Sequence, residues 1–157
     1  MSVATVWLAA SALAQHIRVK SEPQRDFAQY STYQFAPGII TGRHPKLDEK
    51  ALSASIEERI AGGARRAGLR RVDSQASSAA DLKITFFLRI NEDTKRSRFR
   101  TEEVTRYSLE IRIIDRSQKE IWVGTGSGEV EDRRHRFVEP PILRAATLTM
   151  AKFPPKQ

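Results

Sequence analysis

The stretch YSLEIRIIDRSQKEIWVGTGSGEV at residues 107–130 predicts two long β-strands folded back on each other. Its first half alternates apolar and polar side chains, the period-two pattern of a strand buried on one face. The connector at residues 115–119 is short and polar, and Ile121-Trp122-Val123 opens a second β-prone run. A long hairpin of this kind favours an antiparallel α+β scaffold and contains no catalytic chemistry of its own.

Apolar periodicity also predicts three further strands and a helix before this hairpin. Residues 82–90 alternate without a break, and residues 16–20 and 33–35 are shorter candidates. Residues 47–67 form the clearest helix, with Asp48 as its N-cap, Gly68 as its closing residue and one apolar stripe: Leu52, Ile56, Ile60 and Ala64. Gly62 and Gly63 weaken the late turns, so we expect fraying or close packing there.

The remaining segments are predicted to be loops, apart from one last helix. Residues 39–46 and the charged residues 91–103 lack a buried pattern, and residues 133–136 (RRHR) form a second basic loop. Pro140 and Pro141 suit the start of a helix whose buried face carries Ile142, Ala146, Thr149 and Met150.

This order of elements predicts an α+β fold, an antiparallel sheet with both helices packed on one face in a two-layer sandwich. The uncovered face would carry mostly polar side chains: Lys83, Thr85, Arg89, Glu110 and Arg112. Phe87 shares that face, where it either marks a contact site or packs beneath a long basic side chain.

Length and composition are those of one globular domain. The chain has 157 residues, 39% of them hydrophobic and 29% charged, and a net charge of +8. The positive charge favours anionic surroundings such as nucleic acid, anionic lipid or acidic glycans. The absence of cysteine excludes disulfides, Cys-ligated zinc, thiol catalysis and lipidation at a cysteine of this sequence.

The first fourteen residues resemble the end of a signal peptide. Residues 3–14 (VATVWLAASALA) are apolar and uncharged, and Ala12 and Ala14 fit the small-residue cleavage rule. We therefore expect residues 1–14 to be a signal, truncated because no Lys or Arg precedes the apolar run, and residues 15–157 to be a single domain. The alternative is a short N-terminal helix or strand that is buried in the fold.

No catalytic, cofactor-binding or metal-binding residues are predicted. The glycines Gly124, Gly126 and Gly128 precede acidic residues of a strand, whereas a phosphate-binding loop needs a helix directly after it. The three histidines are far apart, and the adjacent carboxylate pairs lie beside Arg or Lys, as surface ion pairs do: Glu57/Glu58, Glu102/Glu103 and Glu131/Asp132. We therefore expect a protein that is not an enzyme.

The basic clusters are the strongest functional signal. KRSRFR at residues 95–100 places Phe99 among cations, a weak form of the stacking-plus-phosphate pattern, without a recognised nucleic-acid motif. Arg65, Arg66, Arg70 and Arg71 flank a helix C-terminus, where cations are favoured locally. An intracellular nucleic-acid-binding module would use Lys95, Arg96, Arg98, Phe99 and Arg100, with the loop at residues 133–136.

The order of several motifs resembles the bacterial domain-of-unknown-function 4136 family, mostly predicted envelope lipoproteins. The motifs span residues 17–156: Phe27-x-x-Tyr30-x-Thr32-Tyr33-x-Phe35-x-Pro37, Gly68-Leu69, Ala80-Asp81-Leu82, Leu109, Ile111, Asp115, Trp122-x-Gly124 and Phe153-Pro154-Pro155-Lys156. The resemblance implies an exported α+β domain and assigns no catalytic residue. Ala14-Gln15 stands where members carry a lipobox cysteine, which disfavours a lipid anchor and favours a soluble periplasmic or secreted form.

Together these features predict an exported, envelope-associated bacterial protein with a binding or structural role and no cofactor. Its expected partner is an anionic envelope component or an envelope protein, with nucleic acid as the alternative.

Overall fold

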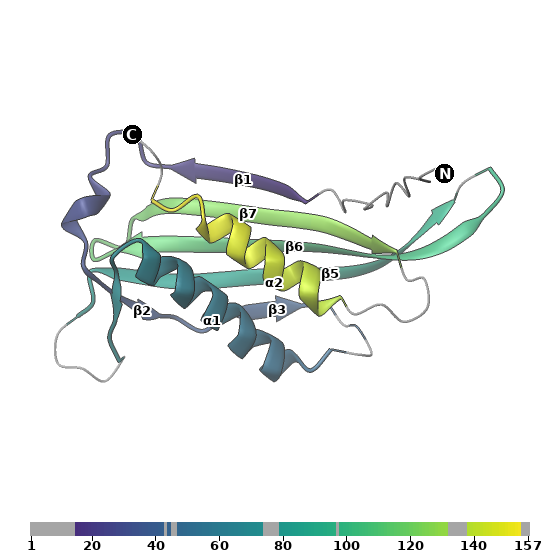
Figure 1. Cartoon of the computed structure of the whole chain (residues 1–157), viewed down its shortest axis with the longest axis horizontal. Coiled ribbons are helices and arrows are strands. Elements are labelled where there is room, and N and C mark those ends of the chain that lie inside the picture. Colours follow the sequence, from purple (N-terminus) through teal and green to yellow (C-terminus); the bar gives the residue numbers. More distant parts are fainter. Residues whose placement is uncertain are drawn as a thin grey trace, which may run out of the picture.

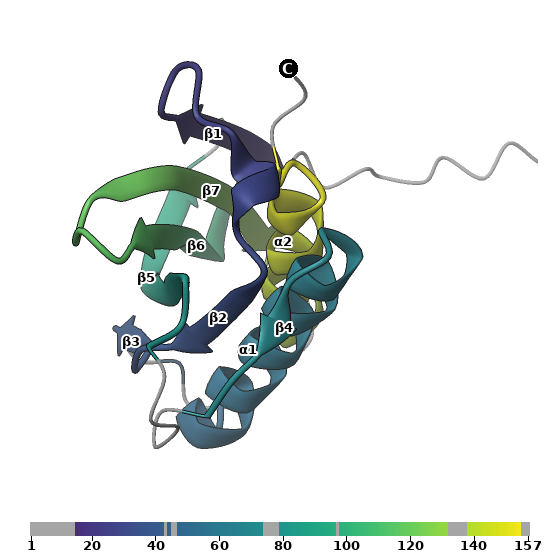
Figure 2. The same cartoon turned by 90° about the vertical axis from the view of Figure 1, so that its left-hand side faces the viewer.

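The computed structural model describes residues 15–42, 44, 47–73, 79–96, 98–131 and 138–154. These residues form a seven-stranded sheet with two α-helices laid across one of its faces (Figures 1 and 2). Along the chain the elements are β1 (His16–Ser21), a 3-10 turn (Phe27–Gln29), β2 (Thr32–Phe35), β3 (Ile39–Thr41), α1 (Glu49–Arg66), β4 (Arg70–Arg71), β5 (Leu82–Arg96), β6 (Thr101–Asp115), β7 (Glu120–Glu131) and α2 (Glu139–Met150).

The sheet is mixed, so the prediction of a purely antiparallel sheet is wrong. Its strand order is β1-β7-β6-β5-β2-β4, and β3 also pairs with β5. The pairs β5–β6, β6–β7 and β7–β1 are antiparallel. The pairs β2–β5, β3–β5 and β2–β4 are parallel. The parallel part arises because α1 provides the crossover that parallel neighbours require. The predicted α+β class and the placement of both helices on one face are confirmed.

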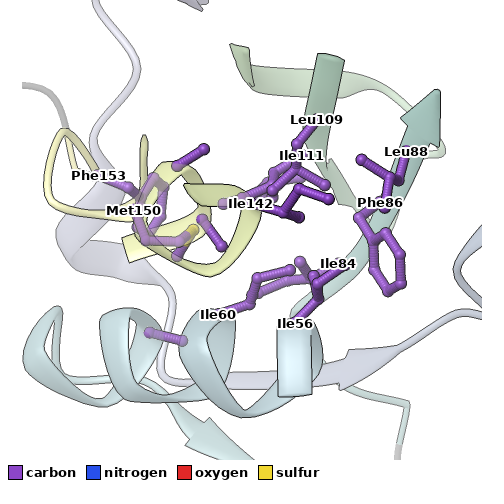
Figure 3. Packing of buried hydrophobic residues seen from close by; sticks show 14 of the residues in the cluster. Ile56, Ile60, Ile84, Phe86, Leu88, Leu109, Ile111, Ile142, Met150 and Phe153 are labelled. Atoms are coloured by element: carbon purple, nitrogen blue, oxygen red, sulfur yellow. The ribbon is translucent and has the colours of Figure 1, made fainter. Parts of the chain in front are cut away.

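Side chains alternate between the two faces of β5 and β6, and the apolar ones point toward the helices. Leu82, Ile84, Phe86, Leu88 and Ile90 are all buried, and their partners on β6 are aligned with them through register pairs such as Phe86 with Ile111. The predicted stripe of α1 and the predicted face of α2 cover this layer (Figure 3). Burial of this apolar surface is the main stabilising contribution to the fold.

The ends of α1 behave as its sequence predicts. The Asp48 carboxylate accepts hydrogen bonds from the backbone N–H groups of Lys50 and Ala51 at 3.0 and 3.1 Å. Gly68 takes a left-handed conformation with φ of +85°, and Leu69 folds back into the core. Gly63 contacts Met150 closely, so close packing of α1 on α2 explains this glycine.

Three parts of the chain differ from the sequence prediction. Residues 39–41 form β3 and residues 70–71 form β4, although neither was predicted as a strand. Residues 91–103, predicted as a loop, instead extend β5 to Arg96 and begin β6 at Thr101. The predicted leader at residues 1–14 and the basic loop at residues 133–136 lie outside the described residues.

Candidate binding site on a basic hairpin arm

The far ends of β5 and β6 form a two-stranded ribbon, here called the arm and defined as residues 94–96 and 98–103. Its cross-strand pairs include Lys95 with Glu102 and Arg96 with Thr101. The pairing of β7 with β6 reaches only to Val104, and that of β3 with β5 only to Arg89. The arm therefore extends past its neighbouring strands and projects from the body of the molecule (Figure 1).

Carboxylates neutralise the base of the arm but leave cations near its tip. Lys95 Nζ lies 3.1 Å from Glu129, and Arg106 pairs with both Glu129 and Asp93. These ion pairs lower the pKa of Glu129 and raise that of Arg106. Nearer the tip, Arg100 lies 3.4 Å from Glu102.

Two arginines of the arm remain available to an external anion. Arg96 and Arg98 are exposed, and neither forms an ion pair with any residue in the described part of the chain. Arg96 is the last residue of β5, and Arg98 lies in the connection to β6 that also carries Arg100. Positive charge without an internal partner is thus concentrated at the outermost point of the arm.

Phe99 is the most exposed large apolar side chain among the described residues. Its exposed fraction is 93%, against 48% for Ile39 and 38% for Val19. Full burial of such a ring is worth about 1.5–3 kcal/mol, and the fold gains almost none of this. Phe99 therefore contributes little to folding and is free to contact another molecule.

The uncovered face of the sheet is a second polar surface. The charged side chains at its centre already form ion pairs with one another. The Arg112 guanidinium lies 4.8 Å from the centre of the Phe87 ring and also pairs with Glu110 and Glu120. This confirms the packing of Phe87 beneath a basic side chain, one of its two predicted roles. Thr85 is buried and donates to the Pro37 carbonyl oxygen at 3.1 Å.

Two open hollows flank the Glu110–Arg112 pair on this face. The larger, of about 430 Å³, also touches Arg18 and Lys20, and the smaller, of about 260 Å³, touches Arg89. Arg18, Lys20 and Arg89 at the rims of the hollows surround the carboxylates of Glu110 and Glu120. This mixture of signs gives the face less attraction for an anion than the tip of the arm has.

Two aspartates of the motif pattern have structural roles at the opposite end of the sheet. Asp81 accepts hydrogen bonds from the backbone and hydroxyl groups of Ser31 and Thr32, and the hydrogen bond from the Ser31 backbone is the main cause of a pKa of about 2. Burial alone would raise the pKa of Asp115, but hydrogen bonds from Ser117 and Lys119 outweigh it and the pKa is lowered.

A carboxyl group with a lowered pKa stays ionised at neutral pH and is poorly suited to carry a proton in catalysis. Asp81 and Asp115 line a hollow of about 340 Å³ with Arg25, Tyr30 and Arg116, and their hydrogen bonds connect loops to strands. Among the described residues, no group of three or more His, Asp or Glu side chains is placed to hold a metal ion.

The glycines of β7 allow α2 to approach the sheet closely. A Cβ added to Gly126 would lie 2.8 Å from Thr149 Oγ1 and 3.0 Å from Ala145 Cβ, both on α2. A Cβ at Gly128 would lie 2.5 Å from the Tyr107 hydroxyl oxygen. Gly124, Gly126 and Gly128 therefore lie in a close-packed strand, as their sequence context predicts, and not in a phosphate-binding loop.

The structure brings the described cations of KRSRFR together on the arm. His16 is exposed on β1 and His44 follows β3, whereas His135 and the arginines at residues 133–136 lie outside the described residues. The pairing of β5 with β6 within the arm differs from the loop that the sequence predicts for residues 91–103. Opposite charges at Lys95 and Glu102, with Thr101 and Val104 as β-formers, were the available signal.

Comparison with known proteins assigns the chain to a family and identifies similar folds. The model of the family described as Domain of unknown function (DUF4136) matches residues 17–155. No curated protein matches the sequence. No helix in the described ranges is long and apolar enough to cross a membrane.

Solved structures share this fold at low sequence identity. A PDZ domain protein from Parabacteroides distasonis is 16% identical with a TM-score of 0.59, and the similarity covers 91% of this chain but only 37% of that one. The PelC dodecamer from Paraburkholderia phytofirmans is 19% identical with a TM-score of 0.50, covering 88% of this chain and 94% of PelC. A PelC variant is 18% identical with a TM-score of 0.51, covering 88% and 93%.

At these identities the solved structures establish the fold alone, whereas the family match extends from the first strand to the residues after the last helix. The chain therefore belongs to the DUF4136 family.

Proposed function

We propose that this protein is a non-catalytic binding protein of the bacterial cell envelope, and that the arm contacts an anionic component there. The observation that carries the proposal is the tip of the arm, where Arg96 and Arg98 have no ion-pair partner within the described residues beside a Phe99 that is 93% exposed. A net charge of +8 over the whole chain supports an anionic partner.

The envelope location is supported by the sequence of residues 1–14 and by membership of the DUF4136 family, because the resemblance to that family implies an exported envelope domain. Mass spectrometry of the mature N-terminus, on protein from separated cytoplasmic and periplasmic fractions, tests this part. A chain that begins at Gln15 in the periplasm is the expected result. An intact Met1 in the cytoplasm would contradict it.

The absence of catalysis is part of the proposal and is supported by the charged groups described above. Asp81 and Asp115 stay ionised at neutral pH, and both are occupied by hydrogen bonds that organise loops. A general acid or base needs a pKa close to the working pH, which neither carboxyl group has.

The binding part is tested by co-sedimentation of the purified protein with isolated envelope fractions at about 0.1 M and about 1 M salt, between which the Debye length falls from about 10 to 3 Å. Binding at low salt should weaken strongly at high salt. The double variant Arg96→Gln/Arg98→Gln should lose most of the low-salt binding.

The matched control is Arg65→Gln/Arg66→Gln, which removes the same charge from exposed positions at the end of α1. If both variants weaken binding equally, overall charge and not the arm is responsible, and the arm proposal fails.

The alternative function, intracellular binding of single-stranded nucleic acid, uses the same cations and the same aromatic ring. It predicts a steep salt dependence of binding to single-stranded DNA or RNA that the Arg96→Gln/Arg98→Gln variant loses. Recovery of the protein from the periplasm would remove this alternative.

A further inference from the structure

We infer that the anionic component contacted by the arm is the surface of an anionic lipid bilayer, with the Phe99 ring inserted among the lipids and the arginines beside it paired with phosphate groups. This inference rests on the proposed function and names the class of ligand for the same site.

The shape of the arm favours a surface over a linear polymer. Among the described residues the tip is a ribbon two strands wide, because β7 and β3 end before it, so no third strand in that part of the chain forms the wall of a groove. A polymer that is bound along its length needs such a groove, as single-stranded nucleic acid does. A projecting tip can reach a flat surface that the wider body cannot approach as closely (Figure 1).

The position of the aromatic ring favours lipid over an anion in solution. Phe99 lies at the end of the hairpin between Arg98 and Arg100, and its side chain is almost completely exposed. Contact with a soluble anion does not remove an apolar ring from water. Entry into the boundary between lipid headgroups and acyl chains does, and this burial is favourable. Clustered Lys and Arg beside an apolar side chain are typical of elements that bind anionic membranes.

The distribution of charge is consistent with contact by the tip. Lys95 is paired with Glu129 toward the body, while Arg96 and Arg98 have no carboxylate partner in the described residues. Each basic residue close to an anionic membrane strengthens binding about fivefold, so Arg96 and Arg98 together account for about 25-fold. Only cations within a Debye length of the lipid contribute in this way.

The test places a fluorescent reporter at the tip of the mature chain that the proposed function expects, residues 15–157. Phe99→Trp is made in this chain, where the buried Trp122 is the other tryptophan. The probes are vesicles of phosphatidylcholine alone, vesicles with an equal part of phosphatidylglycerol, and the same mixture with brominated acyl chains. The inference predicts a blue shift in the emission of the introduced tryptophan with anionic vesicles only, and quenching of that emission by the brominated lipids.

Variants separate insertion of the Phe99 ring from electrostatic attraction between the arginines and the lipid phosphates. Phe99→Ser keeps the net charge and should weaken binding to anionic vesicles about tenfold, since the buried ring is lost. Arg96→Gln/Arg98→Gln should weaken it about 25-fold. Ile39→Ser removes an exposed apolar side chain elsewhere and should leave binding unchanged. All of these positions are exposed, and circular dichroism checks that each variant is folded.

The outcomes distinguish this inference from the function on which it rests. Envelope binding that requires Arg96 and Arg98, with no binding to anionic vesicles or with the emission of the introduced tryptophan unchanged on binding, overturns the lipid inference and leaves the proposed function standing. Envelope binding that is indifferent to both arginines overturns both. Tight arm-dependent binding of single-stranded DNA in place of vesicles also overturns the lipid inference.

Discussion

Replacing Asp81 by Asn should weaken the fold at the point where the parallel strands meet β5. One oxygen of the Asp81 carboxylate accepts hydrogen bonds from the backbone N–H groups of Ser31 and Thr32, both at 2.9 Å, and from their hydroxyl groups at 3.1 and 3.0 Å. The other oxygen lies 2.8 Å from the Arg116 guanidinium. These contacts fix the start of β2 beside the start of β5, where Tyr33 pairs with Leu82.

The size of the effect follows from the pKa of this carboxyl group. The pKa of Asp81 falls from the ordinary value of 3.8 to about 2, with the hydrogen bond from the Ser31 N–H as the largest cause. A shift of this size corresponds to about 2 kcal/mol of folding stability at neutral pH. Asn cannot carry the charge, and its amide would turn a second donor toward Arg116. We therefore expect Asp81→Asn to lower the free energy of unfolding by about 2–3 kcal/mol.

The pH dependence has a definite sign. Because the pKa is lower in the folded state, the contribution is present above the ordinary value of 3.8 and is lost as the pH falls through about 2. The stability gap between the original protein and Asp81→Asn should therefore be full at about pH 7 and close to half of that at about pH 3.

Urea unfolding of both proteins at these two pH values measures the gap. The matched control is Asp93→Asn, because Asp93 is 46% exposed in a surface ion pair with Arg106 and should cost no more than about 1 kcal/mol. Equal losses for Asp81→Asn and Asp93→Asn, or a gap that does not narrow at low pH, would refute this reasoning.

Two further pairs of substitutions test the packing of the fold. Gly126→Ala should lower the free energy of unfolding by about 1–3 kcal/mol in thermal unfolding, because its Cβ would lie 2.8 Å from Thr149 Oγ1. A Cβ at Gly62 would lie near only the end of the Arg66 side chain, so Gly62→Ala should stabilise α1 by up to about 1 kcal/mol. A lower free energy of unfolding for Gly62→Ala would contradict the packing argument. Phe86→Ala should cost about 3–5 kcal/mol, whereas Phe99→Ala should change stability by less than about 0.5 kcal/mol in urea unfolding.

The elements that the sequence predicts correctly are those that bury one face over many residues. The alternation in residues 82–90 and 107–113 and the stripe at Leu52, Ile56, Ile60 and Ala64 each repeat often enough to define a strand or a helix. β3 and β4 contain three and two residues, so a period cannot be recognised in them. Their parallel pairing depends on where α1 returns the chain, which is a tertiary effect that lies outside each segment.

The arm was missed for a related reason that also explains why it can be a binding site. The arm has water on both faces, and the residues at the end of β5, 91–96, are all exposed, so no alternation of apolar and polar side chains marks them. The β-structure there is held by backbone pairing and by opposite charges such as Lys95 and Glu102 across the strands. A flexible loop would lose conformational entropy when it orders on a surface. A paired ribbon has already lost part of that entropy in folding, so it can present Phe99 and its neighbouring arginines together at a lower cost.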